Sequence, residues 1–132
     1  MALPVDVCSL LNRRNIESNR VEFKENWNPT KILHSICAFA NDIEEVGGAY
    51  IIIGVKEDGD GRPEIMGIAS ESMSKLEQEL FKVCNLITPR LIPSFSIEDL
   101  EDRKLAVIWV LSDLNRPYRC PVDVGKERAG SL

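Results

Sequence analysis

The stretch from residue 17 to residue 57 constrains the fold of this chain more than any other. It begins with ESNRVEFKENW, continues through ILHSICAFAND and ends with GGAYIIIGVKED. In RVEFK the apolar Val21 and Phe23 alternate with charged residues, which predicts a half-buried strand. An Asn-Pro pair then starts a segment with apolar residues at helical spacing, which predicts a helix at residues 29–40. AYIIIGV is apolar on both faces, which is typical of a central strand.

The rest of the chain supplies further helices and strands. An apolar stripe predicts a first helix at residues 4–13, and EIMGI is a partner strand for AYIIIGV. A second long amphipathic helix is expected at residues 70–87, ended by Pro89. SFSIEDLE, a turn at DRK and LAVIWVL form a hairpin whose second strand is the more central. We therefore expect a single α+β domain, with a mixed β-sheet, two or three packed helices and the order α-β-α-β-β-α-β-β.

Composition narrows the classes of function. The net charge is −5, whereas nucleic-acid binders usually carry a basic footprint, so any phosphate contact has to come from a local patch. No apolar run approaches the length of a membrane helix, and the N-terminus lacks a signal-peptide pattern, so we expect a cytoplasmic protein without a membrane partner. Four widely spaced cysteines and a single histidine argue against a zinc site and predict reduced thiols at Cys8, Cys37, Cys84 and Cys120.

Acidic residues lie at both ends of the 17–57 stretch. Glu17 precedes the first strand, and Glu22 lies in it. Glu57 and Asp58 follow the last strand. Carboxylate oxygens at strand ends are suitable ligands for Mg²⁺ or Mn²⁺. Glu17 and Glu22 would face opposite sides of one continuous strand, so they converge only if Glu17 lies on the connector. The pattern alone favours solvated acids, with Glu22 paired with Lys24.

Basic and aromatic residues meet in the segment NRPYRCP near the end of the chain. Tyr118 lies between Arg116 and Arg119, and this combination can hold a nucleotide by stacking and phosphate contact. An ordinary exposed loop is the alternative. Arg20 and Lys24 on the first strand are further candidate phosphate contacts.

Four motifs occur along the chain in this order: E-x4-E-F-K, CAFAN, GGAYIIIGV and RPY. Together they resemble the Schlafen Alba-type domain, over about residues 12–122. This domain occurs in many bacterial proteins described as transcriptional regulators or helicase-like proteins. The resemblance implies a module that binds DNA or RNA without a cofactor. In some eukaryotic relatives it implies a metal-dependent endoribonuclease with three acids, which by position are Glu17, Glu22 and Glu57. Relatives often have aspartate at the third position, where this chain has Glu57 followed by Asp58.

The resemblance also bears on the extent of the protein. Family members commonly continue with a further strand and domain, so we expect residues 1–132 to be the N-terminal part of a longer protein. A missing strand would leave an open sheet edge, which favours a homodimer. The leading hypothesis is a nucleic-acid-binding module of a transcriptional regulator. The alternatives are a Mg²⁺- or Mn²⁺-dependent ribonuclease and a protein-interaction or dimerisation module.

Overall fold

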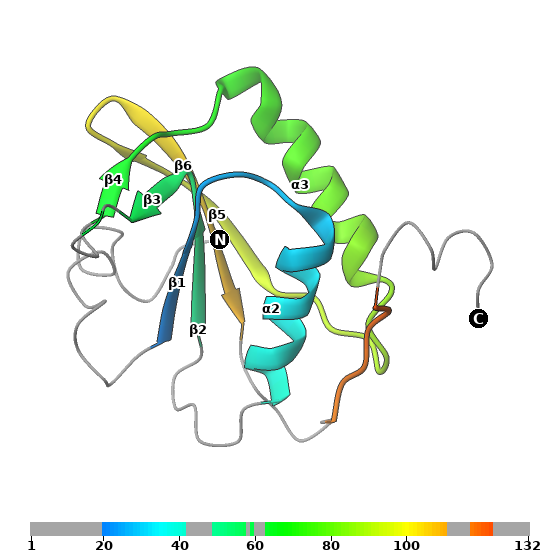
Figure 1. Ribbon diagram of the computed structural model, residues 1–132. Helices are drawn as coiled ribbons and strands as arrows, with labels where there is room; N and C mark the ends of the chain where they lie inside the picture. Colours follow the sequence, from blue (N-terminus) through cyan, green and yellow to red (C-terminus); the bar gives the residue numbers. More distant parts are fainter. Residues whose placement is uncertain (1–19, 42–48, 58, 60–62, 111–116, 123–132) are drawn as a thin grey trace.

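The computed structural model describes residues 20–41, 49–57, 59, 63–110 and 117–122 (Figure 1). Its elements are β1 (Arg20–Lys24), α2 (Pro29–Asn41), β2 (Ala49–Ile53), β3 (Val55–Glu57), β4 (Pro63–Ile65), α3 (Ser70–Cys84), β5 (Ser94–Leu100) and β6 (Arg103–Val110). The predicted α+β class and the order of these elements are confirmed, while the predicted helix at residues 4–13 lies outside the described residues. Neither described helix has the length and apolarity needed to cross a membrane.

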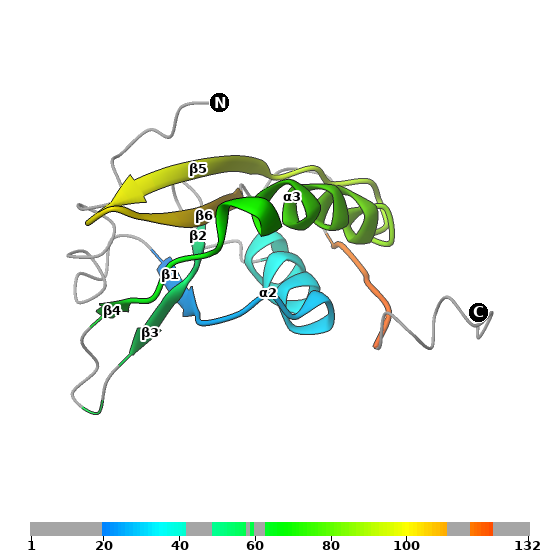
Figure 2. The ribbon, with the colours of Figure 1, turned by 90° about the horizontal axis from the view of Figure 1, so that it is seen from above.

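The main sheet has four strands in the order β1-β2-β6-β5. β1 is parallel to β2, and the other two pairings are antiparallel, so the sheet is mixed as predicted. Both helices lie on the same side of this sheet (Figures 1 and 2). The two strands that were expected to be central, β2 and β6, occupy the middle, and β1 and β5 form the edges.

Alternation along β2 explains why its sequence is apolar throughout. Ala49, Ile51 and Ile53 belong to the main core cluster, which also contains the buried side chains of both helices. Tyr50 and Ile52 face the other side of the sheet and belong to a second cluster. A strand whose two faces are both buried cannot show the polar alternation of an edge strand.

Local sequence signals account for both helices. The Asn28 side chain accepts a hydrogen bond from the Lys31 backbone N–H at 3.1 Å, which caps α2 as the Asn-Pro pair predicts. The predicted end of α3 at residue 87 is wrong by three residues. Beyond Cys84, backbone N–H groups donate to the carbonyl three residues earlier instead of four, as Ile87 does to Cys84. This is the tighter 3₁₀ pattern, which ends the helix before Pro89.

Gly54 divides the predicted strand AYIIIGV into β2 and β3. Its φ of 107° turns the chain, its N–H donates to the Lys24 carbonyl, and its carbonyl accepts from Met66 and Gly67. β4 therefore pairs only with β3, in a separate two-stranded sheet. The predicted pairing of EIMGI with AYIIIGV is confirmed for the part of that strand beyond Gly54. Only a residue without Cβ adopts this backbone conformation readily.

The turn between β5 and β6 consists of Glu101 and Asp102, not of the predicted DRK. Both residues have positive φ, 53° and 61°, and they join the paired residues Leu100 and Arg103. This is the backbone of a two-residue type I′ hairpin, whose twist matches that of the strands. Arg103 and Lys104 consequently belong to β6.

Candidate nucleic-acid interface

Residues 117–122, called here the clamped segment, lie along α2. The Asn41 side chain binds the backbone of Tyr118 on both sides: Oδ1 accepts from the N–H at 2.6 Å, and Nδ2 donates to the carbonyl at 2.9 Å. Cys37, one turn earlier, also donates to that carbonyl at 3.3 Å. The side chains of α2 thus give this segment the kind of pairing that a neighbouring strand would otherwise supply. Asn41 and Cys37 end and begin the CAFAN motif, so this contact joins it to the RPY motif.

A second set of bonds fixes the other side of the clamped segment. Thr88 and Arg119 exchange two backbone hydrogen bonds of 2.8 Å each, as an isolated antiparallel bridge. The chain that follows α3 therefore holds the segment opposite α2. Residues that neighbour one another in an extended segment point in opposite directions. Here Tyr118 points inward and is only 3% exposed, while Arg119 is exposed.

The position of Tyr118 changes its expected role. Its side chain is part of the main core cluster, so the ring fills the core and is not presented to solvent as a stacking surface. The prediction that Tyr118 stacks on a nucleotide would require the clamped segment to leave α2. Arg119 is the residue of this motif that the structure presents to solvent. Arg116 lies outside the described residues.

Two further side chains, Arg90 and His34, belong to segments that contact the clamped segment. Arg90 is exposed and follows Thr88, the bridge partner of Arg119, by two residues. His34 is exposed on α2, with Nε2 at 2.9 Å from the carbonyl of Pro121. The clamped segment and its surroundings thus bring together groups from three parts of the chain. Arg90 was not among the predicted contacts, because only the bridge of Thr88 to Arg119 connects its segment with the clamped segment.

Lys24, a predicted phosphate contact on β1, forms an ion pair with an acid of the same strand. Lys24 Nζ lies 3.1 Å from a carboxylate oxygen of Glu22, and the same oxygen accepts a hydrogen bond from the Ser35 hydroxyl at 2.5 Å. The interpretation of Glu22 as the partner of Lys24 is confirmed. A phosphate would have to compete with Glu22 for Lys24. The side chain of Arg20 lies outside the described residues.

The three-acid site remains a prediction, since Glu17 and Asp58 lie outside the described residues. Within the described part of the chain, no three His, Cys, Asp or Glu side chains form a group that could hold a metal ion. Glu57 is exposed at the end of β3, beyond the turn at Gly54, whereas Glu22 is bonded to Ser35 beside α2. The described acids therefore do not form a metal site by themselves.

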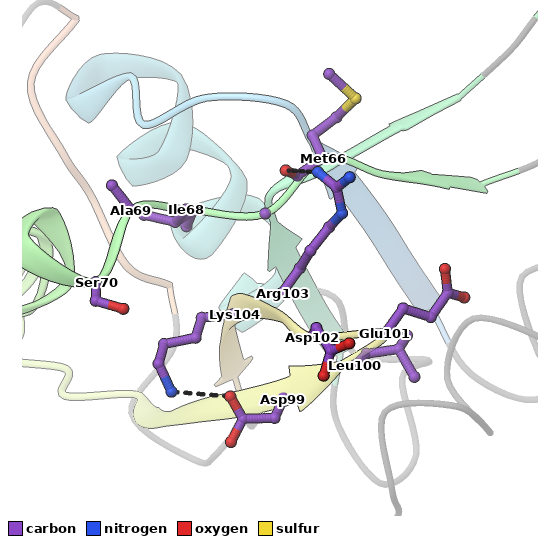
Figure 3. Close-up of a pocket in the computed structure, with 11 residues that line it drawn as sticks. Met66, Ile68, Ala69, Ser70, Asp99, Leu100, Glu101, Asp102, Arg103 and Lys104 are labelled. Carbon is purple, nitrogen blue, oxygen red and sulfur yellow. Dashed lines mark hydrogen bonds and ion pairs between the residues drawn. The ribbon is translucent and has the colours of Figure 1, made fainter.

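A hollow of about 770 Å³ lies at the opposite end of the sheet, between residues 66–70 and residues 99–104 (Figure 3). We call it the hairpin corner. Arg103 donates to the Met66 carbonyl at 3.1 Å, and Lys104 forms an ion pair with Asp99 at 2.9 Å. With Glu101 and Asp102, three carboxylates line the hollow against two cations. This charge balance is unfavourable for a polyanion.

Comparison with known proteins agrees with this fold. The family model described as Schlafen, AlbA_2 matches residues 17–129. A comparison with curated protein sequences gives no match.

The solved structures that are similar to the chain include the following two. One is the N-terminal domain of a RecG-related protein from Nitrosomonas europaea, a candidate ATP-dependent DNA helicase, with a TM-score of 0.66 and 20% identity, covering 85% of this chain and 78% of that one. The other is the DIP2311 protein from Corynebacterium diphtheriae, with a TM-score of 0.55 and 18% identity, covering 86% of this chain and 25% of that one. At these identities the likeness extends to the fold alone. The match of the family model over most of the chain shows that the protein belongs to the Schlafen AlbA_2 family.

Proposed function

We propose that this domain binds nucleic acid through the clamped segment, as the binding module of a cytoplasmic bacterial transcriptional regulator. The observation that carries the proposal is the position of Arg119, which is exposed on a backbone tethered by Asn41 on one side and Thr88 on the other. Membership of the Schlafen AlbA_2 family and the fold shared with a RecG-related domain support a nucleic-acid-related function.

Rigid presentation is the physical reason to favour Arg119. A guanidinium group forms bidentate, charge-assisted bonds with phosphate oxygens. When the backbone that carries it is already fixed, less conformational entropy is lost on binding. Arg90, two residues after the bridge partner of Arg119, adds a second exposed positive charge, whereas the net charge of −5 repels the rest of a polyanion. We therefore expect modest affinity with a steep dependence on salt.

Fluorescence anisotropy with labelled single-stranded RNA, single-stranded DNA and duplex DNA tests the proposal. We expect binding at 25 mM salt (roughly) that falls with increasing salt. Arg119→Gln should weaken binding about tenfold, since a hydrogen bond to a charged group contributes roughly 1.5 kcal/mol or more. It should also reduce the slope of log affinity against log salt concentration by the amount that about one phosphate contact contributes.

Arg103→Gln is the matched control, because Arg103 is also an exposed arginine but belongs to the hairpin corner. It should leave the affinity within about twofold of the original, as expected for a residue outside the contact surface. Absence of binding at low salt, or equal losses in the two variants, would contradict the proposal.

A cleavage assay with the labelled RNA separates the nuclease alternative from binding alone. Labelled RNA is incubated with the protein and Mn²⁺, and the product lengths are read on a denaturing gel. Cleavage that is lost in Glu22→Gln would establish the nuclease interpretation instead. We do not propose it, because the described structure engages Glu22 with Ser35 and Lys24.

A further inference from the structure

Two cysteines that are far apart in the sequence meet where the clamped segment contacts α2. Cys37 lies in α2 and is 7% exposed, and Cys120 lies in the clamped segment and is partly exposed. Cys37 Sγ donates to the carbonyl of Tyr118 at 3.3 Å, two residues before Cys120. Alternate residues of an extended segment point to the same side, so Cys120 faces the same side as the buried Tyr118. Cys120 also packs against the cluster that contains Cys37, and both cysteines are free thiols in this structure.

The two sulfur atoms differ in their readiness to react. Burial, together with the neighbouring Cys120, raises the pKa of Cys37 to about 11. Burial also raises the pKa of Cys120, but the hydrogen bond from Cys37 acts in the opposite direction. Cys120 is the more exposed of the two, so an incoming reagent reaches it first. Cys84 is buried in α3, and burial raises its pKa to about 12.

We propose that Cys37 and Cys120 form a redox modification site, which a small-molecule disulfide such as oxidised glutathione converts into an intramolecular disulfide. The Cys120 thiolate attacks one sulfur of the reagent, forms a mixed disulfide and releases one small thiol. The Cys37 thiol then loses its proton and attacks the Cys120 sulfur, which releases the second small thiol. Two protein thiols are oxidised to one disulfide, and one reagent disulfide is reduced to two thiols.

The position of this bond predicts its consequence. The reduced segment is held to α2 by the hydrogen bonds of Cys37 and Asn41 to Tyr118. A covalent link one residue after Arg119 would prevent the segment from leaving α2. Disulfides in the reducing cytoplasm are usually transient and redox-sensing, so this site would respond to oxidative conditions. An effect on nucleic-acid affinity rests on the proposed function, whereas formation of the bond does not.

Thiol counting and peptide mapping test the bond directly. The full chain is incubated with oxidised glutathione, its remaining thiols are alkylated, and its mass is measured. We expect the loss of two thiols per chain without a dimer. Trypsin places the four cysteines on four different peptides, so the linked species should join residues 32–56 to residues 120–126. Linkage through Cys8 or Cys84, or glutathione adducts alone, would overturn the proposal.

Variants distinguish the pair from general thiol reactivity. Cys84→Ser should still form the bond, whereas Cys120→Ala should not, and Cys120 is the safer position to change because it is only partly buried. Amide hydrogen exchange of residues 117–122 then tests whether the disulfide holds the clamped segment on α2. We expect exchange to be at least about tenfold slower in the oxidised protein, because opening of the segment is prevented. Unchanged exchange would show that the bond does not hold the segment on α2.

Discussion

The clamped segment and the hairpin corner both carry exposed arginines, but they present them differently. At the hairpin corner, Arg103 is bonded to the Met66 carbonyl, and Lys104 is paired with Asp99 beside two further acids. On the clamped segment, it is the backbone of Arg119 that is held, through its bridge to Thr88. The comparison shows that the contacts around a cation, more than its exposure, decide how well it can serve a polyanionic ligand.

Gly54→Ala should give the largest loss of stability, beside the hairpin corner, whose Met66 and Gly67 bond to the Gly54 carbonyl. Gly54 has a φ of 107°, and a Cβ would lie 3.0 Å from Leu105 Cδ2 and 3.3 Å from Ile68 Cγ1. Backbone strain and this crowding together should reduce the free energy of unfolding by about 3 kcal/mol, measured by urea denaturation.

Gly59→Ala is the matched control for that change. A Cβ at Gly59 would meet nothing within 4 Å, and its φ is not positive in the range that favours glycine. This change should be neutral or stabilise the protein by up to about 1 kcal/mol. Similar losses in the two variants would show that the geometry of Gly54 is not what matters.

Asn41→Ala should have the next largest effect, on the clamped segment. It removes both side-chain bonds to the Tyr118 backbone, which should lower the free energy of unfolding by about 2 kcal/mol. Because Arg119 would then be less rigidly held, nucleic-acid affinity should also fall. The exposed Asn26 offers a control, since Asn26→Ala should change stability by less than about 0.5 kcal/mol. A stability loss in Asn41→Ala without any loss of affinity would show that nucleic-acid binding does not depend on the hydrogen bonds of Asn41 to the clamped segment.

The smallest effect is expected from the double change Glu101→Asn and Asp102→Gly. Both positions have positive φ, and Asn-Gly is the preferred pair for a type I′ turn. Stability should rise by about 1 kcal/mol, as measured by thermal unfolding, while nucleic-acid affinity stays the same. A change in affinity would show that the hairpin corner belongs to the binding surface and that the two regions do not differ in this respect.

Much of the fold could be predicted because the relevant signals are local. The alternation in RVEFK, the Asn-Pro helix start and the apolar central strands each depend on residues within a few positions of one another. The predictions failed where a single backbone conformation decided the outcome. Gly54 ended a strand that periodicity would have continued, and the hairpin turned at Glu101 and Asp102 instead of at DRK.

The candidate site was less predictable because its contacts join distant positions. Nothing in RPY indicates that Tyr118 points into the core while Arg119 points out. That outcome depends on Asn41, which is 77 residues away in the sequence. The contact between the segment after α3 and the clamped segment likewise depends on the bridge of Thr88 to Arg119.

By itself, the sequence determined the class of fold, the central strands and the motifs that mark the family, because hydrophobic period and helix capping act over short distances. Only the tertiary structure decided which motif residues are available. It placed Tyr118 in the core, paired Lys24 with Glu22, exposed Arg119 and brought Cys37 to the segment that carries Cys120. The physical reason is that burial and hydrogen bonding belong to contacts between segments, and these contacts exist only after the chain has folded.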